Sequence, residues 1–355
     1  MVATTIDVVS RHDGDRTGGA RKVTAALVLL LILVSITGLA IGAADTSLWS
    51  GLLAFVQGEE LSVRDKIVLL HIRLPRLLTG VTVGAALATS GALLQGLFRN
   101  PLADPGIIGV SAGASFGAVC AIVLGTVLPF ASALGMALLP IFAFAGAWSA
   151  TLLLYGIATR QGRTSVATML LAGIALSALT MALTGVLIYM ADDAQMRDFT
   201  FWNMGSLSGA NWSKLTIAAP VILVSLIVAQ ALASGLNSMA LGEAAARHMG
   251  VSVQLVKRLT ILCVAAATGV AVAISGGIGF VGIVVPHILR LLSGPDHRRL
   301  LLNSALLGAC VLVLADVVAR VIIAPAELPI GIITAILGGP FFLWILLRQR
   351  GVVDL

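Results

Sequence analysis

The sequence predicts an all-α, polytopic membrane protein with about ten transmembrane helices. Of the 355 residues, 59% are hydrophobic, and the mean hydropathy is +1.06. Charged residues make up 11% of the chain, against about 25% in soluble globular domains. The apolar residues gather in long unbroken runs, whereas a β-barrel would show short alternating segments. The chain is therefore expected to cross a membrane many times as helices.

Apolar windows separated by Gly, Pro and charged residues give the spans in order. The first ends in small residues, as a cleavable signal does, but its 22 residues exceed the about 7–15 of a signal core, so it is kept as a span. The eighth contains Pro286 and is expected to be broken or kinked. Residues 1–22 predict a flexible cytoplasmic tail, and 23–355 a single transmembrane domain. The predicted spans are 23–44, 77–98, 106–127, 137–158, 166–190, 215–235, 259–275, 278–293, 300–323 and 328–347.

The distribution of Lys and Arg predicts the orientation. Ten spans place both termini on one side, and a cytoplasmic location for them puts 15 of the 22 basic residues inside. This bias is typical of a multi-pass protein of the bacterial inner (cytoplasmic) membrane. The net charge of +6 comes from these loops and not from a separate basic domain, so no nucleic-acid partner is expected. The seven basic residues expected outside are Arg64, Lys66, Arg73, Arg76, Arg197, Lys214 and Arg320.

Three of these outer arginines stand out. Arg73 and Arg76 bracket a proline in HIRLPR (71–76), and Arg320 follows Asp316 by one helical turn. One interpretation is that they reach lipid phosphates or a nearby carboxylate. The other is a docking surface for an acidic partner outside the membrane, because guanidinium groups bind carboxylates in a fork. Both interpretations stay open at this point.

Several motifs together carry a resemblance to a known family. They are RLPRLLTGVTVGAALATSGALLQ (73–95), RNPLADPGIIGVSAGASFGA (99–118), LGEAAARHMG (241–250), GGIGFVGIVVPHILRLLSGPDHRRLLL (276–302) and ELPIGIITAILGGPFFLWILLR (327–348). From about residue 70 onward the chain resembles FecCD-type permease subunits of the type II ABC importers for iron-siderophores, haem and cobalamin. The resemblance implies a homodimeric permease in membrane lipid, with two ABC ATPase subunits on the cytoplasmic side and a periplasmic substrate-binding protein.

The resemblance also implies roles for residues. Arg73, Arg76 and Arg320 would dock the binding protein. The cytoplasmic region of about 238–258 would couple to the ATPase, and its four residues between E-A-A and glycine match the iron and cobalamin branch. The expected coupling residues are Gly242, Glu243, Ala246, Arg247, Met249 and Gly250. Small and turn-forming residues would line or gate the path, with helix packing as their other role; the candidates are Asn100, Pro101, Ser111, Gly113, Ser115, Phe280 and Pro286.

Two rival functions come from other classes. GVSAG (109–113) matches the G-x-S-x-G pattern of serine hydrolases, and His287 lies in another span, but the strand–turn–helix context of that pattern is not predicted. An ion-coupled secondary transporter would carry ionisable groups in mid-membrane, where only Asp316 comes near. The chain has no GxxxxGK[ST] motif, so it is expected to borrow an ATPase and not to be an enzyme itself.

The cargo is predicted from a weaker match. FWNMGSLSGANW (201–212) looks most like the haem branch, and a ferric siderophore or cobalamin is the alternative. Haem iron needs His, Met, Cys or Tyr, and His71 is the one histidine expected outside, so haem should pass without stable axial coordination. No metal site and no permanently bound cofactor are expected; ATP acts on the partner subunit. The cysteines have no CxxC spacing and should be inert.

Overall fold

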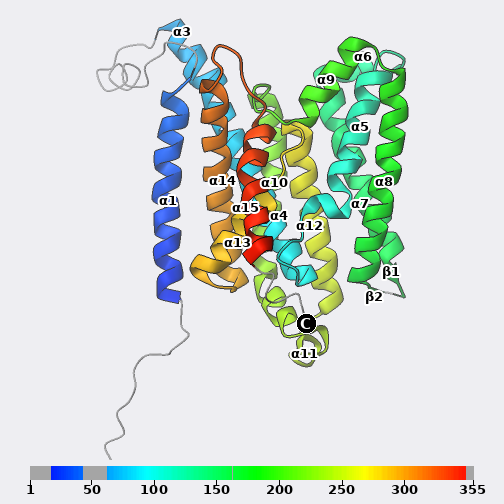
Figure 1. Cartoon of the computed structure of the whole chain (residues 1–355), viewed down its shortest axis with the longest axis vertical. Helices are drawn as coiled ribbons and strands as arrows, with labels where there is room; N and C mark the ends of the chain where they lie inside the picture. Colours follow the sequence, from blue (N-terminus) through cyan, green and yellow to red (C-terminus); the bar gives the residue numbers. More distant parts are fainter. Residues whose placement is uncertain (1–16, 43–61, 162, 349–355) are drawn as a thin grey trace, which may run out of the picture.

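Within the described residues, one apolar helix corresponds to each of the ten predicted spans (Figure 1). The computed structural model describes residues 17–42, 62–161 and 163–348. Within these residues seven helices are long and apolar enough to span a membrane, and three apolar helices are shorter. The prediction of about ten membrane helices is therefore confirmed. The helices are α1 Thr17–Ala40, α4 Leu74–Phe98, α5 Val110–Leu124, α7 Leu138–Ala158, α8 Val166–Met190, α10 Trp212–Ala240, α12 Val253–Ser275, α13 Val281–Ser293, α14 His297–Val321 and α15 Ile330–Arg348.

Several helices begin earlier than predicted, because charged residues lie inside them. α1 starts at Thr17, so residues 17–22 belong to a helix and not to the predicted tail; residues 1–16 lie outside the described part of the chain. The helix that contains α4 starts at Val63 and runs for 36 residues. α13 is continuous through Pro286, which corrects the expectation of a broken span.

Short elements connect the membrane helices. α9 was not predicted; a capping box of Asp192 and Gln195 starts it. The two strands form an antiparallel pair with Thr159 opposite Thr164. The short elements are α3 Val63–Lys66, the π-helix η1 Ile67–Arg73, the 3-10 helix η2 Pro105–Ile108, α6 Ala131–Leu134, the 3-10 helix η3 Gly135–Ala137, β1 Thr159–Arg160, β2 Arg163–Thr164, α9 Asp193–Asn203 and α11 Glu243–His248.

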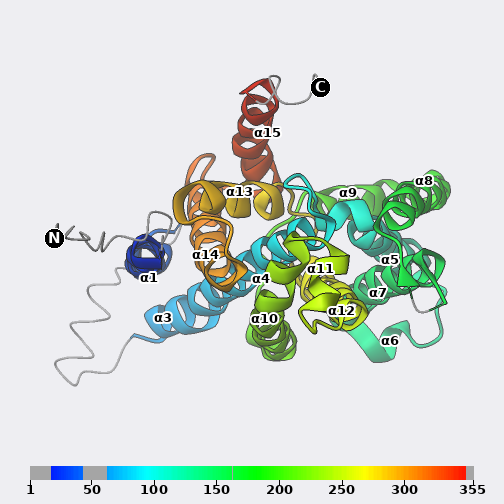
Figure 2. The same ribbon diagram turned by 90° about the horizontal axis from the view of Figure 1, so that it is seen from below.

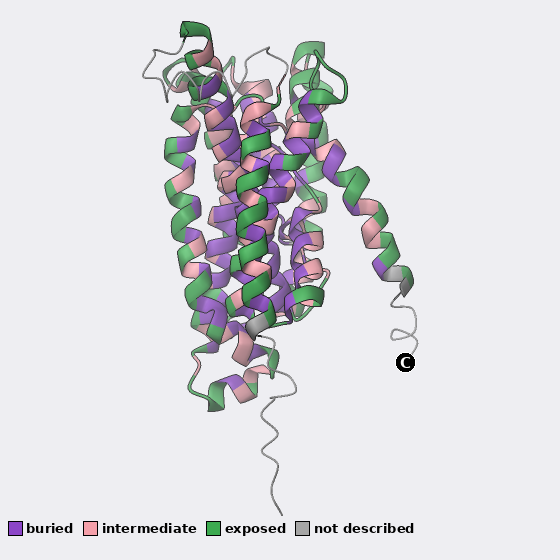
Figure 3. Ribbon diagram, turned by 90° about the vertical axis from the view of Figure 1, so that its left-hand side faces the viewer, coloured by how far each residue is buried: buried purple, intermediate pink, exposed green. Residues whose placement is uncertain are grey.

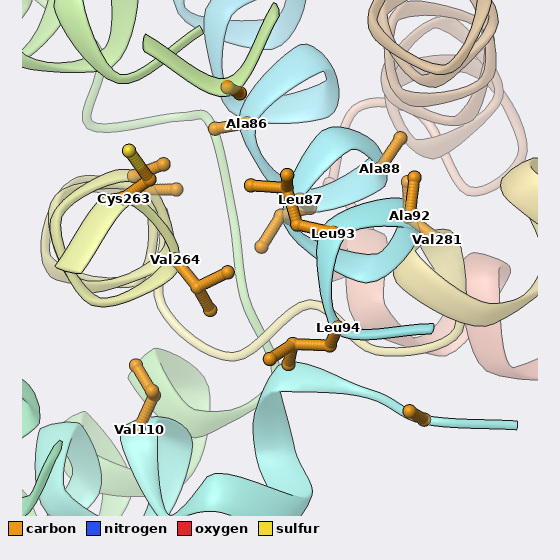
Figure 4. Close-up of a cluster of buried hydrophobic side chains, with 14 of the residues drawn as sticks. Ala86, Leu87, Ala88, Ala92, Leu93, Leu94, Val110, Cys263, Val264 and Val281 are labelled. Carbon is orange, nitrogen blue, oxygen red and sulfur yellow. The ribbon is translucent and has the colours of Figure 1, made fainter. Parts of the chain in front are cut away.

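The core surrounds α4, which packs against α14, α12, α10 and α13. In Figure 4 its Leu87, Leu93 and Leu94 point toward Val264 of α12 and its surroundings. Small residues let the backbones approach closely: a Cβ on Gly84 would collide with the carbonyl oxygen of Gly308 on α14. The buried centre is therefore held by close helix packing.

The outer helices expose apolar surface. Only 11% of the most apolar 18-residue window of α8 is buried within the described structure. α15 leans away from the bundle (Figures 2 and 3). The chain enters α1 and leaves α15 at the end of the bundle that carries α11 and the β1–β2 pair, whereas α3 and α6 lie at the other end (Figure 1). The described helices thus start and finish on the same side, as an even number of crossings requires.

Candidate functional site

The three arginines that the sequence predicts to lie outside gather at the α3 end of the bundle and are all buried. Arg73 belongs to η1, Arg76 to α4 and Arg320 to α14, and their exposed fractions are 4%, 7% and 6%. Buried charges in proteins need a partner. Each of the three guanidinium groups is therefore expected to have a partner within the fold.

Two carboxylates neutralise Arg76 and Arg320. Arg76 forms two hydrogen bonds with Glu327, of 2.8 and 3.0 Å, and its Nε donates to Asp316 at 2.9 Å. Asp316 also lies 3.1 Å from Nε of Arg320, one helical turn away on α14. The nearby-carboxylate interpretation is thus confirmed for both arginines.

The end of α1 is the second partner of this cluster. Arg73 donates to the carbonyl oxygens of Leu39 and Ala40 at 2.7 and 3.2 Å. Arg320 donates to the carbonyl oxygens of Gly38 and Ile41 at 3.1 and 2.9 Å. The last carbonyls of a helix have no partner within it, and cations there interact favourably with the helix dipole. Arg73 and Arg320 therefore fasten α1 to the bundle.

The predicted coupling region forms a short helix, α11, at the opposite end of the bundle. Gly242 and Gly250, at φ angles of 105° and 81°, precede and follow α11. Glycine adopts such angles without the strain that a side chain would bring. Ala246 is fully buried. Three of the six predicted coupling residues are exposed: Arg247, Met249 and Gly250.

A buried lysine joins this helix to the rest of the fold, and the sequence reasoning missed its role. The Nζ of Lys257 on α12 lies 2.6 Å from Glu243 of α11 and donates to the carbonyl oxygen of Thr164 at 2.9 Å. A cavity of about 250 Å³ opens beside this contact, lined by Arg163, Arg247 and residues 251–255. In the sequence, Lys257 counted only toward the cytoplasmic charge bias.

The predicted path residues of α5 divide between packing and a polar contact. A Cβ on Gly113 would collide with the carbonyl oxygen of Gly146 on α7, so Gly113 has the helix-packing role. Ser111 and Ser115 are half-buried, and Ser115 hydrogen-bonds Asn203 of α9 at 3.1 Å. α5 follows η2 and not a strand, so GVSAG lacks the geometry of a nucleophile elbow.

The remaining path candidates lie in two places. Asn100 and Pro101 form an exposed turn after α4, where the Asn100 side chain accepts from Leu102 N–H. Phe280, at a φ angle of 68°, is the N-cap residue immediately before α13 and packs against Gly338 of α15. Pro286 is buried within α13. Within the described residues, no hydrogen bond joins Ser111 or Ser115 to these four candidates. The structure therefore does not link the predicted path residues into one polar site.

Comparisons with known proteins agree with these elements. The model of the FecCD transport family matches residues 28–348. The chain is 45% identical over 333 residues to the hemin transport system permease protein HmuU of Yersinia pestis, covering 93% of this chain and 98% of that protein. It is 47% identical over 287 residues to the cobalamin import system permease protein BtuC of Halobacterium salinarum, covering 81% and 75%.

A solved structure supports the same assignment. An inward-facing metal-chelate type ABC transporter superposes with a TM-score of 0.81 at 33% identity, over 92% of this chain and 99% of that chain. The family match extends from α1 to α15. It includes the cluster of Arg73, Arg76 and Arg320 and also the contact between Lys257 and Glu243. This chain belongs to the FecCD transport family.

Proposed function

We propose that this chain is the permease subunit of an ATP-driven importer that receives haem from a periplasmic binding protein and passes it through the inner membrane. The observation that carries the proposal is the 45% identity to a hemin permease over 98% of its length. Cobalamin is the second candidate cargo, because vitamin B12 permeases are similarly related, at 44% over 95% of the Salmonella typhi protein. A ferric siderophore is the third candidate in the same importer class.

The permease works as two copies with two ATPase subunits. Membership of the FecCD transport family, whose relatives include the permease components of hemin and cobalamin import systems, supports this arrangement. The α11 end faces the cytoplasm and binds the ATPase, which hydrolyses ATP, so the permease is not itself an enzyme. Haem is cargo and not a resident cofactor, and it passes by alternating access without a stable axial ligand.

Docking of the binding protein uses the cluster of Arg73, Arg76 and Arg320 at the other end. Asp316 already pairs with Arg76 and Arg320, and Glu327 pairs with Arg76. The side chain of Glu327 is 34% exposed, whereas that of Asp316 is 4% exposed. An acidic side chain of the binding protein therefore replaces Glu327 at Arg76. The contact is an exchange of carboxylates, which avoids leaving a buried cation unpaired.

Reconstitution of the complete transporter tests this function. The permease, its ATPase and its binding protein are placed in liposomes, and haem, cobalamin and a ferric siderophore are offered separately. We expect ATP-dependent haem uptake that stops when the ATPase is inactivated. Uptake of cobalamin or the siderophore without uptake of haem would contradict the assignment of haem as the cargo. Uptake driven by an ion gradient without ATP would overturn the importer class.

A further inference from the structure

Lys257 is a buried cation in the part of the chain that we place at the ATPase. Its side chain is 3% exposed, and Lys is among the residues least often buried without a partner. Two groups from different elements satisfy it: the carboxylate of Glu243, the first residue of α11, and the carbonyl oxygen of Thr164. The 2.6 Å contact with Glu243 is a short, charge-assisted one.

Both backbone polar groups of Thr164 form hydrogen bonds with side chains of α12. Its N–H donates to Oε1 of Gln254 at 3.1 Å, and its carbonyl oxygen accepts from Lys257. Both partners lie on the first turns of α12. The next residue, Ser165, is the N-cap of α8 and accepts from Thr168 N–H. Two hydrogen bonds therefore connect the start of α12 to the backbone immediately before α8.

The positions of α11 and α8 give this contact its significance. α11 is a six-residue helix at the surface, and α8 is a long helix with little of its surface buried within this chain. The Glu243 side chain is 31% exposed but Lys257 is buried, so separating them would leave a buried cation without its carboxylate, which is unfavourable. Glu243, Lys257 and Thr164 should therefore move together. We infer that Lys257 is a positioning residue that transmits displacement of α11 to the start of α8. This inference rests on the proposed function.

The test measures cargo imported per ATP hydrolysed by the reconstituted transporter. Lys257→Met removes both contacts and leaves Glu243 partly hydrated. We expect ATP hydrolysis to stay within twofold of the wild type, while cargo per ATP falls at least fivefold. Lys22→Met is the matched control: Lys22 is an exposed lysine on α1, outside the coupling region, no ion pair joins it to the described residues, and the ratio should be unchanged. A wild-type ratio in Lys257→Met would overturn the inference, as would a proportional loss of both activities.

A second measurement separates transmission from a merely structural role. Spin labels on Met249→Cys beside α11 and Leu171→Cys on α8, both exposed, report each helix with and without ATP in a background without the native cysteines. In Lys257→Met we expect the α11 displacement to persist and the α8 displacement to shrink. If the variant does not assemble, Glu243→Gln is measured in the same way. Equal displacement of α8 in wild type and variant would overturn the inference, whereas a wild type that imports nothing would instead contradict the proposed function.

Discussion

Arg76 and Glu327 lie 251 positions apart in the sequence and meet through two hydrogen bonds of 2.8 and 3.0 Å. This fork is the geometry in which guanidinium groups bind carboxylates most strongly. It shows that Arg76 is able to bind a carboxylate in the way that docking requires. It also means that an internal carboxylate competes with any external one.

The first prediction follows from that competition. Glu327→Gln removes the internal competitor while Asp316 still pairs with Arg76, so the binding protein should bind more tightly. We expect its Kd to fall about three- to tenfold, since exposed ion pairs contribute up to about 1 kcal/mol and hydrogen bonds to charged groups about 1.5–3. Surface plasmon resonance with the immobilised permease measures the change. Asp193→Asn, an exposed acidic residue at the start of α9, is the control.

The opposite outcome has a clear meaning. Unchanged or weaker binding of Glu327→Gln would show that the binding protein does not use Arg76. Charge reversal at Arg76 is a poorer test, because it would bring three carboxylates together in a buried site. Lost uptake would then report misfolding.

The second prediction concerns Asp316. Among the described residues, Asp316→Asn leaves Arg320 without a carboxylate in direct contact and Arg76 with Glu327 alone. Removing one partner of a buried ion pair costs about 3–5 kcal/mol, so the thermal unfolding midpoint in detergent should fall markedly. Arg247→Gln breaks the 3.8 Å pair with Glu243, in which the Arg247 side chain is 59% exposed, and should change stability by less than about 1 kcal/mol. Equal midpoints for the two variants would contradict this explanation of the cluster.

Hydropathy was sufficient to predict the apolar membrane helices but not their charged ends. The predicted span 166–190 matches α8 residue for residue, because no charge interrupts it. In contrast, α12 was expected from 259 and begins at Val253, because Lys257 and Arg258 ended the apolar window. A window treats a lysine as a boundary, whether it faces water or is paired inside the fold.

The ion-pair partners of the charged residues could not be predicted from hydropathy for the same reason. Asp316 was found because it lies one turn from Arg320 on the same helix. Glu327 and Lys257 pair with residues on other elements, and the pairing depends on how α4, α11, α12 and α14 pack. The available signal for Glu327 was an acidic residue immediately before the predicted last span, two positions ahead of Pro329.

The third prediction tests the attachment of α1. Arg73→Gln removes the charge that stabilises the carbonyl groups of Leu39 and Ala40. Cations at a helix C-terminus contribute about 0.3–2 kcal/mol, so the last turn of α1 should fray more often. Hydrogen exchange followed by mass spectrometry should then show faster exchange over residues 38–41, with α8 unchanged. Unaltered exchange in α1 would mean that other contacts hold its end.

The fourth prediction distinguishes packing from path lining at Gly113. A Cβ at this position would collide with the backbone of Gly146, which can move only if α5 and α7 separate. Gly113→Ala should therefore destabilise the permease by about 1–3 kcal/mol, the usual cost of overpacking. Gly156→Ala on α7, where a Cβ meets nothing within 4 Å, is the matched control and should be neutral or slightly stabilising. Thermal unfolding and uptake are measured together: a stable Gly113→Ala protein with reduced uptake would assign Gly113 to the path instead.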